Sequence, residues 1–177
     1  DQAELLACLA SDLCEGVLDS RWWWRVLFKH GNFGSRVFST WSDSPEYVPA
    51  ALEMLARKAR LKHFVRALSI ADTCELLRVV THSFALSKLQ SVLEQGLEHA
   101  ADNAALSSRA LPAISRSTAS WHRFAPEALD HTFGLEQQCL LGVALTIRRA
   151  PAVVRSLQFA RATLDWLRAV VTGSIDE

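Results

Sequence analysis

Apolar residues recur every three or four positions along most of the chain, which is the spacing of an amphipathic helix. The clearest stripes lie in residues 3–18, 49–59, 61–68, 87–106, 135–149 and 151–171. The segment Ser69-Ile70-Ala71-Asp72 has a cap serine and a carboxylate three residues later, as in a capping box, and predicts a helix through Val80. No segment shows a convincing alternation of apolar and polar residues before a hairpin turn. We therefore predict an all-α fold of about seven or eight helices, packed as antiparallel hairpins in an orthogonal or bundle-like array.

Three features make finer predictions about packing. The segment from Leu135 to Arg149 is apolar on most of its surface, so we expect it at the centre of the fold. Pro151 predicts the start of a last helix that runs to about Val171, with Leu157 among its inward residues. A glycine inside a helix costs up to ~1 kcal/mol relative to alanine. Gly96 therefore predicts a close helix crossing in the helix expected at 87–106.

A chain of 177 residues is most simply one domain, residues 1–177. Residues 107–124 are rich in serine and interrupt the helical pattern. We expect them to form a long connection between a larger N-terminal and a smaller C-terminal helical part. The chain begins at Asp1 without an initiator methionine, which indicates a processed product or a fragment of a longer protein. No stretch approaches the ~18 uninterrupted apolar residues of a membrane span.

Three consecutive tryptophans, Trp22, Trp23 and Trp24, lie between Arg21 and Arg25. On a helix the three indoles fan over about 200°, so they cannot all face one core, and Trp22 or Trp24 at an edge is expected to be exposed. Trp and Arg are preferred residue types in the energetic hot spots of protein interfaces. Three interpretations are open. The indoles plug a helix junction, one or two of them anchor a protein partner, or they stack on a base or a sugar.

A second candidate surface is the basic face, which consists of Arg57, Lys58, Lys62 and Arg66. Helical spacing places these cations opposite inward-facing apolar residues, where they could grip phosphates or an acidic protein, or simply face solvent. Lys+Arg and Asp+Glu both total 19, so the formal net charge is zero. This balance argues against a general binder of nucleic acid or of anionic membranes.

The sequence contains no recognisable catalytic or metal-binding motif. The four cysteines form no C-x-x-C pair, and the six histidines include no pair at i+3 or i+4. We therefore expect free thiols in a reducing compartment, and neither a metal nor a cofactor. Glu94 and Glu98 lie four residues apart and are expected to form a solvated acidic face, since a general acid/base pair would need a pocket.

Five short segments suggest a resemblance to a known group of proteins. They are Leu13 through Trp24, Pro49-Ala50-Ala51-Leu52, Phe64-Val65-Arg66-Ala67-Leu68, Leu140-Leu141-Gly142 and Arg149-Ala150-Pro151. In the order of these segments the chain resembles helical accessory or structural proteins of bacterial contractile injection systems, the phage-tail-like machines. The resemblance implies a non-enzymatic assembly component that contacts other subunits, and it carries over no functional residues.

The sequence thus predicts a cytoplasmic, non-enzymatic helical module for protein interaction or assembly, with a protein partner. The expected partner-binding residues are Arg21, Trp22, Trp23, Trp24, Arg25, Arg57, Lys58, Lys62 and Arg66. One alternative is a nucleic-acid-associated helical domain that uses the Arg57–Arg66 basic face, and another is an enzyme with a site built from scattered residues. Assembly of the chain with itself is also open.

Overall fold

The computed structural model describes residues 1–28, 33–102 and 119–172. All regular elements in these ranges are helices, which confirms the predicted all-α class. Eight of the ten α-helices in the described ranges contain seven residues or more, in line with the predicted number. The elements in chain order are α1 (Gln2–Cys14), η1 (Leu18–Ser20), α2 (Trp22–Leu27), α3 (Phe33–Ser42), η2 (Pro45–Tyr47), α4 (Val48–Arg57), α5 (Leu61–Ala67), α6 (Ile70–Ser83), α7 (Ser87–Asp102), η3 (Pro126–Leu129), α9 (Leu135–Arg149), α10 (Pro151–Val154) and α11 (Leu157–Thr172).

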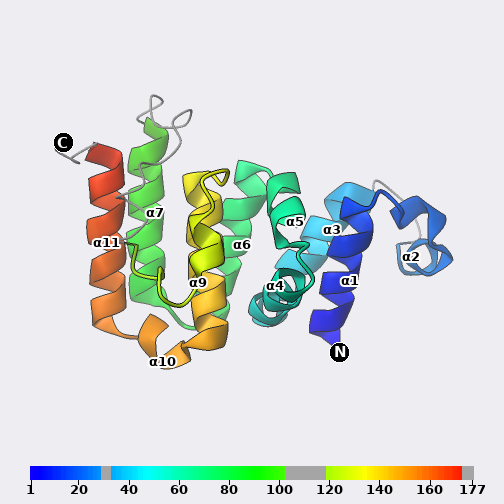
Figure 1. Ribbon diagram of the computed structural model, residues 1–177, viewed down its shortest axis with the longest axis horizontal. Helices are drawn as coiled ribbons and strands as arrows, with labels where there is room; N and C mark the ends of the chain where they lie inside the picture. Colours follow the sequence, from blue (N-terminus) through cyan, green and yellow to red (C-terminus); the bar gives the residue numbers. More distant parts are fainter. Residues whose placement is uncertain (29–32, 103–118, 173–177) are drawn as a thin grey trace.

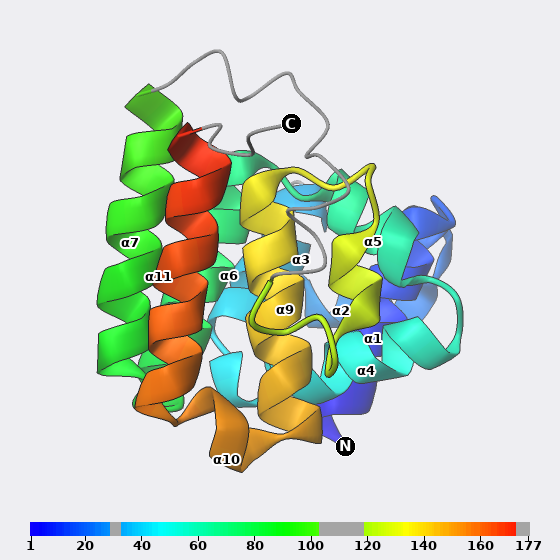
Figure 2. The ribbon, with the colours of Figure 1, turned by 60° about the vertical axis from the view of Figure 1, so that its left-hand side comes forward.

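The helices are arranged side by side along the long axis of the molecule, in an order that differs from their order in the sequence (Figure 1). Helices α11 and α7 lie at one end, α9 and α6 come next, and α2 lies at the opposite end beyond α1. The most extensive pairings join α7 to α11, α6 to α9, and α4 to both α1 and α9. Figure 2 shows α7 and α11 side by side, with α9 next to them and α10 linking α9 to α11.

Helix α9 is the central element, as its apolar composition predicted. Its bounds, Leu135–Arg149, are the predicted ones, and the ten consecutive residues Gln138–Ile147 are all buried. Gly142 on this helix faces the indole of Trp121, and an added Cβ would overlap the ring. The ring of Trp121 also meets that of Trp166 edge to face, with 4.8 Å between their centroids. A glycine is therefore required where the aromatic pair packs on the central helix.

Two other predictions about helix ends and crossings are confirmed. The hydroxyl of Ser69 accepts a 3.0 Å hydrogen bond from the amide of Asp72, which caps α6 as expected. At Gly96 an added Cβ would lie 2.5 Å from Cδ1 of Leu167, so this glycine marks a close crossing of α7 and α11.

The last predicted helix is instead two helices, and this prediction was wrong. Helix α10 ends at Val154, and α11 begins at Leu157. The cause is Ser156, whose hydroxyl accepts a 3.1 Å hydrogen bond from the amide of Phe159 and so starts a new helix. Leu157, expected to face inward, is 48% exposed in the first turn of α11.

Residues 107–118 of the predicted serine-rich connection lie outside the described residues. The remainder, 119–124, forms turns that pack on the helices and bury Ala119 and Trp121 completely or nearly so. Helix α9, which follows this stretch, packs against both α4 and α6, which precede it. The helices before and after residues 107–118 thus share a core.

Arg149 at the end of α9 joins three elements through its guanidinium. It donates a pair of 2.8 Å hydrogen bonds to the carboxylate of Glu127 and another of 2.8 Å to Glu53, and it also reaches the backbone carbonyl of Phe124. The hydrogen bonds from Arg149 hold the pKa of Glu127 below its ordinary value, although partial burial of this carboxylate acts in the opposite direction. This cluster links α9, η3 and α4.

Candidate protein-interaction site

The position of α2 is determined by a sharp turn after the first helix. Gly16 adopts a φ of +67°, which side chains with a Cβ rarely adopt, and it ends α1. The short helix η1 follows, and Arg21 is extended, with φ −87° and ψ 111°. The chain thereby turns away from α1 and starts α2 at the outer end of the molecule (Figure 1).

Trp24 anchors α2 to this end of the protein. Its side chain is only 2% exposed, and its indole Nε1 donates a 2.7 Å hydrogen bond to Oδ2 of Asp12 on α1. The ring also stacks on that of Phe28, with 6.1 Å between centroids and an interplanar angle of 19°. The sequence placed Trp24 among the partner-binding residues. Its burial removes it from that set, because a residue inside the fold is not available to a partner.

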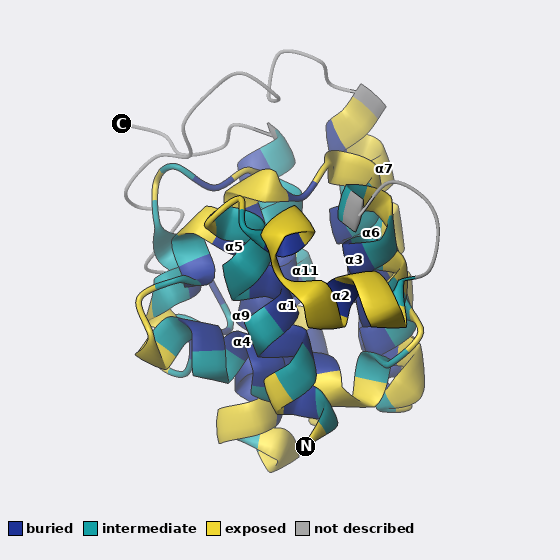
Figure 3. Cartoon of the chain, turned by 90° about the vertical axis from the view of Figure 1, so that its right-hand side faces the viewer, coloured by how far each residue is buried: buried dark blue, intermediate teal, exposed yellow. Residues whose placement is uncertain are grey.

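The other face of α2 is apolar and open to solvent. Trp22 is 65% exposed, Trp23 36%, Val26 59% and Leu27 56%. We call these four residues the tryptophan tip. Figure 3 views the molecule from this end and shows α2 lying across the front with most of its surface exposed. The exposure of Trp22, at an edge of the 200° fan, agrees with the expectation from helical geometry.

The tip arises from the helical spacing of its side chains. Trp22 and Val26 are four residues apart, as are Trp23 and Leu27, so the two pairs form neighbouring stripes on one side. The rings of Trp22 and Trp23 meet edge to face, with 5.9 Å between centroids. Because one helix of six residues buries a single indole, its remaining apolar side chains have no place in the core.

Two arginines give the tip a positive edge. The guanidinium carbon of Arg21 lies 5.2 Å from the centre of the Trp23 ring, within range of a cation–π interaction. Its Nε is also 4.0 Å from Oδ2 of Asp12, the carboxylate that Trp24 uses. Arg25 is exposed in the last turn of α2. The tip and the two arginines at its edge thus bring together the aromatic and arginine side chains that dominate interface energetics.

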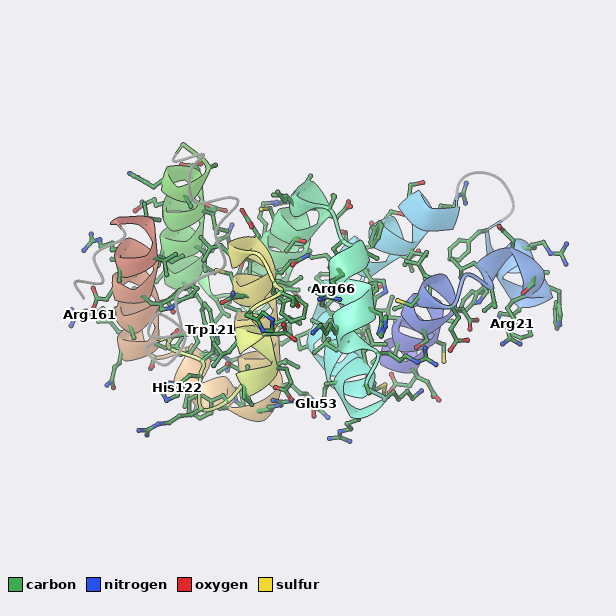
Figure 4. The ribbon with its side chains drawn as sticks, turned by 45° about the horizontal axis from the view of Figure 1, so that its top comes forward. Arg21, Glu53, Arg66, Trp121, His122 and Arg161 are labelled. Atoms are coloured by element: carbon green, nitrogen blue, oxygen red, sulfur yellow. The ribbon has the colours of Figure 1, made fainter. Side chains whose placement is uncertain are left out.

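The basic face has fewer cations free to bind a partner than the sequence suggested. Nε of Arg57 is 3.3 Å from a carboxylate oxygen of Glu53, and Nζ of Lys62 is 2.8 Å from Oδ2 of Asp130. Lys58 and Arg66 are exposed and make no ion pair within the described part of the chain. Figure 4 shows Arg66 well separated from Arg21, so the basic face and the arginine beside the tip do not form a common patch.

The structure also contains an apolar groove that was not predicted from the sequence. It lies between α6 and α7, has a volume of about 400 Å³, and includes Cys74 and several glutamates. Partial burial raises the pKa of the Cys74 thiol, and the nearby charge of Glu136 adds to this effect. A thiol with a raised pKa is a weak nucleophile, and none of the described lining residues is a histidine that could activate it.

The sequence-based prediction included Trp22 and Trp23 of the tip, but it did not include Val26, Leu27, Asp12 or the groove. Asp12 has no periodic or motif relationship to Trp24, so only the fold brings the two side chains together. The groove depends on the angle between α6 and α7, which helical periodicity does not encode. Within residues 1–28, 33–102 and 119–172, no group of three or more His, Cys, Asp or Glu side chains is arranged to hold a metal ion.

The comparisons with known proteins add no family assignment. The chain matches no protein-family model, no curated protein and no solved structure. The resemblance to proteins of contractile injection systems therefore stays a prediction. Among the described helices, none combines the length and the apolar character needed to cross a bilayer.

Proposed function

We propose that this chain is a helical interaction module that binds a protein through its tryptophan tip. The observation that carries the proposal is the exposure of Trp22, Trp23, Val26 and Leu27 on a helix that Trp24 fixes to the body. Grouped apolar side chains of this size at a protein surface mark interaction sites, whereas single exposed ones are ordinary. A tip held in place before binding also loses less conformational entropy on binding.

The charges of the basic face and of the whole chain support a protein partner over a nucleic acid. Of the four cations of the basic face, Arg57 and Lys62 already interact with Glu53 and Asp130. Binding of phosphates depends on a surplus of free positive charge, and the chain has a formal net charge of zero. The resemblance to assembly components of contractile injection systems agrees with the same proposal.

Site-specific photo-crosslinking in the source cells tests the proposal. The photoreactive amino acid benzoylphenylalanine replaces Trp22 in one variant and Leu157, which is 48% exposed on α11, in a matched control. We expect a discrete protein adduct from position 22 and none from position 157. Adducts of equal yield and identity from both positions, or none from position 22, would remove the tip as a binding surface.

A further inference from the structure

Helices α6 and α7 form an antiparallel hairpin whose two arms pack on different neighbours. The turn between them contains Ala85 at a φ of 56°. Helix α7 packs mainly along α11, where Gly96 lets Leu167 approach closely, whereas α6 packs mainly on α9. Because α6 packs on α9 and α7 packs on α11, the two helices of the hairpin diverge. They leave a groove of about 400 Å³ between them, which we call the α6/α7 groove.

The floor of this groove is apolar. Leu77 and Leu93 lie at its base and are 3% and 2% exposed, and Leu97 and Cys74 are half-buried beside them. Ile70 stands at the edge with 66% of its surface exposed. Part of this apolar floor is open to water. An apolar segment that covered it would bury this surface, which is energetically favourable.

The edge of the groove is acidic. Its charged residues in the described part of the chain are Glu75, Glu94, Glu98, Glu136 and Arg78, a net charge of −3. The guanidinium of Arg78 donates hydrogen bonds of 2.7 and 2.9 Å to the carboxylate of Glu75, which neutralises this pair. Glu94, Glu98 and Glu136 therefore give the groove its charge, and they favour a basic apolar occupant.

We propose that the occupant is the tryptophan tip of a second copy of this chain. The tip presents large apolar side chains between two arginines, Arg21 and Arg25, and no residue of Trp22–Leu27 is acidic. Arg21 faces the carboxylate of Asp12 at 4.0 Å, so within the described residues Arg25 gives this end of the molecule its unpaired positive charge. That charge is opposite to the charge of the groove, and both surfaces are apolar at their centres. Apolar contact provides the affinity of such a complex, and the charges select the partner and its orientation.

The positions of the two surfaces make the contact intermolecular. The tip lies at one end of the molecule and α7 lies near the other (Figure 1), and Trp24 holds α2 on α1. One copy therefore places its tip in the groove of the next copy, which is a heterologous contact that builds an open chain or a closed ring. The inference rests on the proposed function of the tip and specifies its partner.

Sedimentation velocity of the purified full chain gives the first test. Concentrations from about 1 to 200 μM bracket a micromolar dissociation constant. We expect the weight-average mass to rise above the monomer mass with concentration, and the rise to shrink with added salt. A mass that stays at the monomer value over the whole range overturns the inference.

Two double variants then test the tip and the groove one at a time. The tip variant W22A/V26E keeps an intact groove, and the groove variant E94R/E98R keeps an intact tip. Each alone is expected to remain monomeric, and an equimolar mixture is expected to form a dimer with twice the monomer mass. Two outcomes overturn the contact between tip and groove. In the first, neither variant associates alone and their mixture forms no dimer. In the second, either variant alone associates as strongly as the wild type.

A matched control and a second readout distinguish this inference from the proposed function. The variant D43R/E46R changes two exposed carboxylates outside the groove by the same charge and is expected to associate like the wild type. Crosslinking from position 22 in the purified protein is expected to join two copies of the chain. An adduct with a different protein in cells, together with a monomeric purified chain, overturns self-assembly and leaves the binding role of the tip intact.

Discussion

The indole nitrogen of Trp24 donates a 2.7 Å hydrogen bond to the carboxylate of Asp12, and this bond fastens α2 to α1. The same carboxylate faces Arg21 at 4.0 Å, so one side chain positions both Trp24 and Arg21, which flank the two exposed tryptophans of the tip. The side chain of Asp12 is 16% exposed, so the hydrogen bond is largely shielded from water. Tip orientation is therefore expected to depend on this one residue.

Replacement of Asp12 by alanine is expected to loosen α2 without unfolding the protein. The buried indole N–H would lose its acceptor, which costs ~1–3 kcal/mol. Hydrogen exchange is the measurement: amides of Trp22–Leu27 should exchange faster in D12A, while those of α5 keep their protection. D12N is the control, because its amide oxygen can still accept the bond, and equal exchange in D12A and wild type would contradict the anchoring role.

Trp22 and Trp24 are expected to respond in opposite ways to alanine. W22A should change the free energy of unfolding by less than ~0.5 kcal/mol, because the side chain is 65% exposed. In binding to the partner, the same change should cost ~2 kcal/mol or more. W24A removes a buried aromatic side chain and should lower the free energy of unfolding by ~3–5 kcal/mol. Urea unfolding and titration calorimetry measure the two effects, and a large loss of stability in W22A would contradict the site.

The elements that follow from local pattern were predictable from the sequence. Two of them, the bounds of α9 and the cap at Ser69, depend only on residues within one helix. The close crossing at Gly96 was predicted because glycine destabilises a helix, and closer packing against a neighbouring helix can offset this loss of stability. The 100° rotation between neighbouring helical residues predicted that Trp22 or Trp24 would be exposed, and the structure exposes Trp22. These predictions needed no knowledge of where other helices lie.

The remaining features depend on contacts between distant segments. The break between α10 and α11 comes from Ser156 acting as a cap, although the apolar stripe continues past it. The burial of Trp24 depends on its hydrogen bond to Asp12. The α6/α7 groove exists because α6 packs on α9 while α7 packs on α11. Glu94 and Glu98 were correctly placed on one face of a helix, but the apolar floor beside them could not be foreseen.

Gly142→Ala is expected to destabilise the protein strongly, although alanine favours helices by up to ~1 kcal/mol over glycine. The added methyl group would overlap the ring of Trp121, which is fully buried and packed against Trp166. Overpacking of this kind costs ~1–3 kcal/mol or more, and a trapped ring cannot move aside. Thermal unfolding with Gly134→Ser as control tests this. Gly134 is exposed at the cap of α9, where serine should be neutral or stabilising.

Stability is expected to fall at acidic pH through Asp130 and Glu127. Burial alone would raise the pKa of Asp130, but hydrogen bonds from Lys62 and Thr132 outweigh it and hold this pKa far below the ordinary value. A folded-state pKa below the unfolded one means that the unfolded chain binds more protons between the two values. The stabilisation is therefore present above about pH 4, the unfolded pKa of a carboxyl group, and is lost as the pH falls further.

The contribution of Asp130 to this pH dependence can be isolated with one variant. Lys62→Met removes the cation that lies 2.8 Å from Asp130. We expect the free energy of unfolding at pH 7 to fall by about 1 kcal/mol or less, since 42% of the Lys62 side chain is exposed and solvent screens the ion pair. The difference in stability between pH 7 and pH 3 should shrink as well. Arg66→Met removes a cation from the same helix that has no ion pair in the described residues, so its pH profile should match the wild type. An unchanged profile in K62M would contradict the role of the Lys62–Asp130 pair.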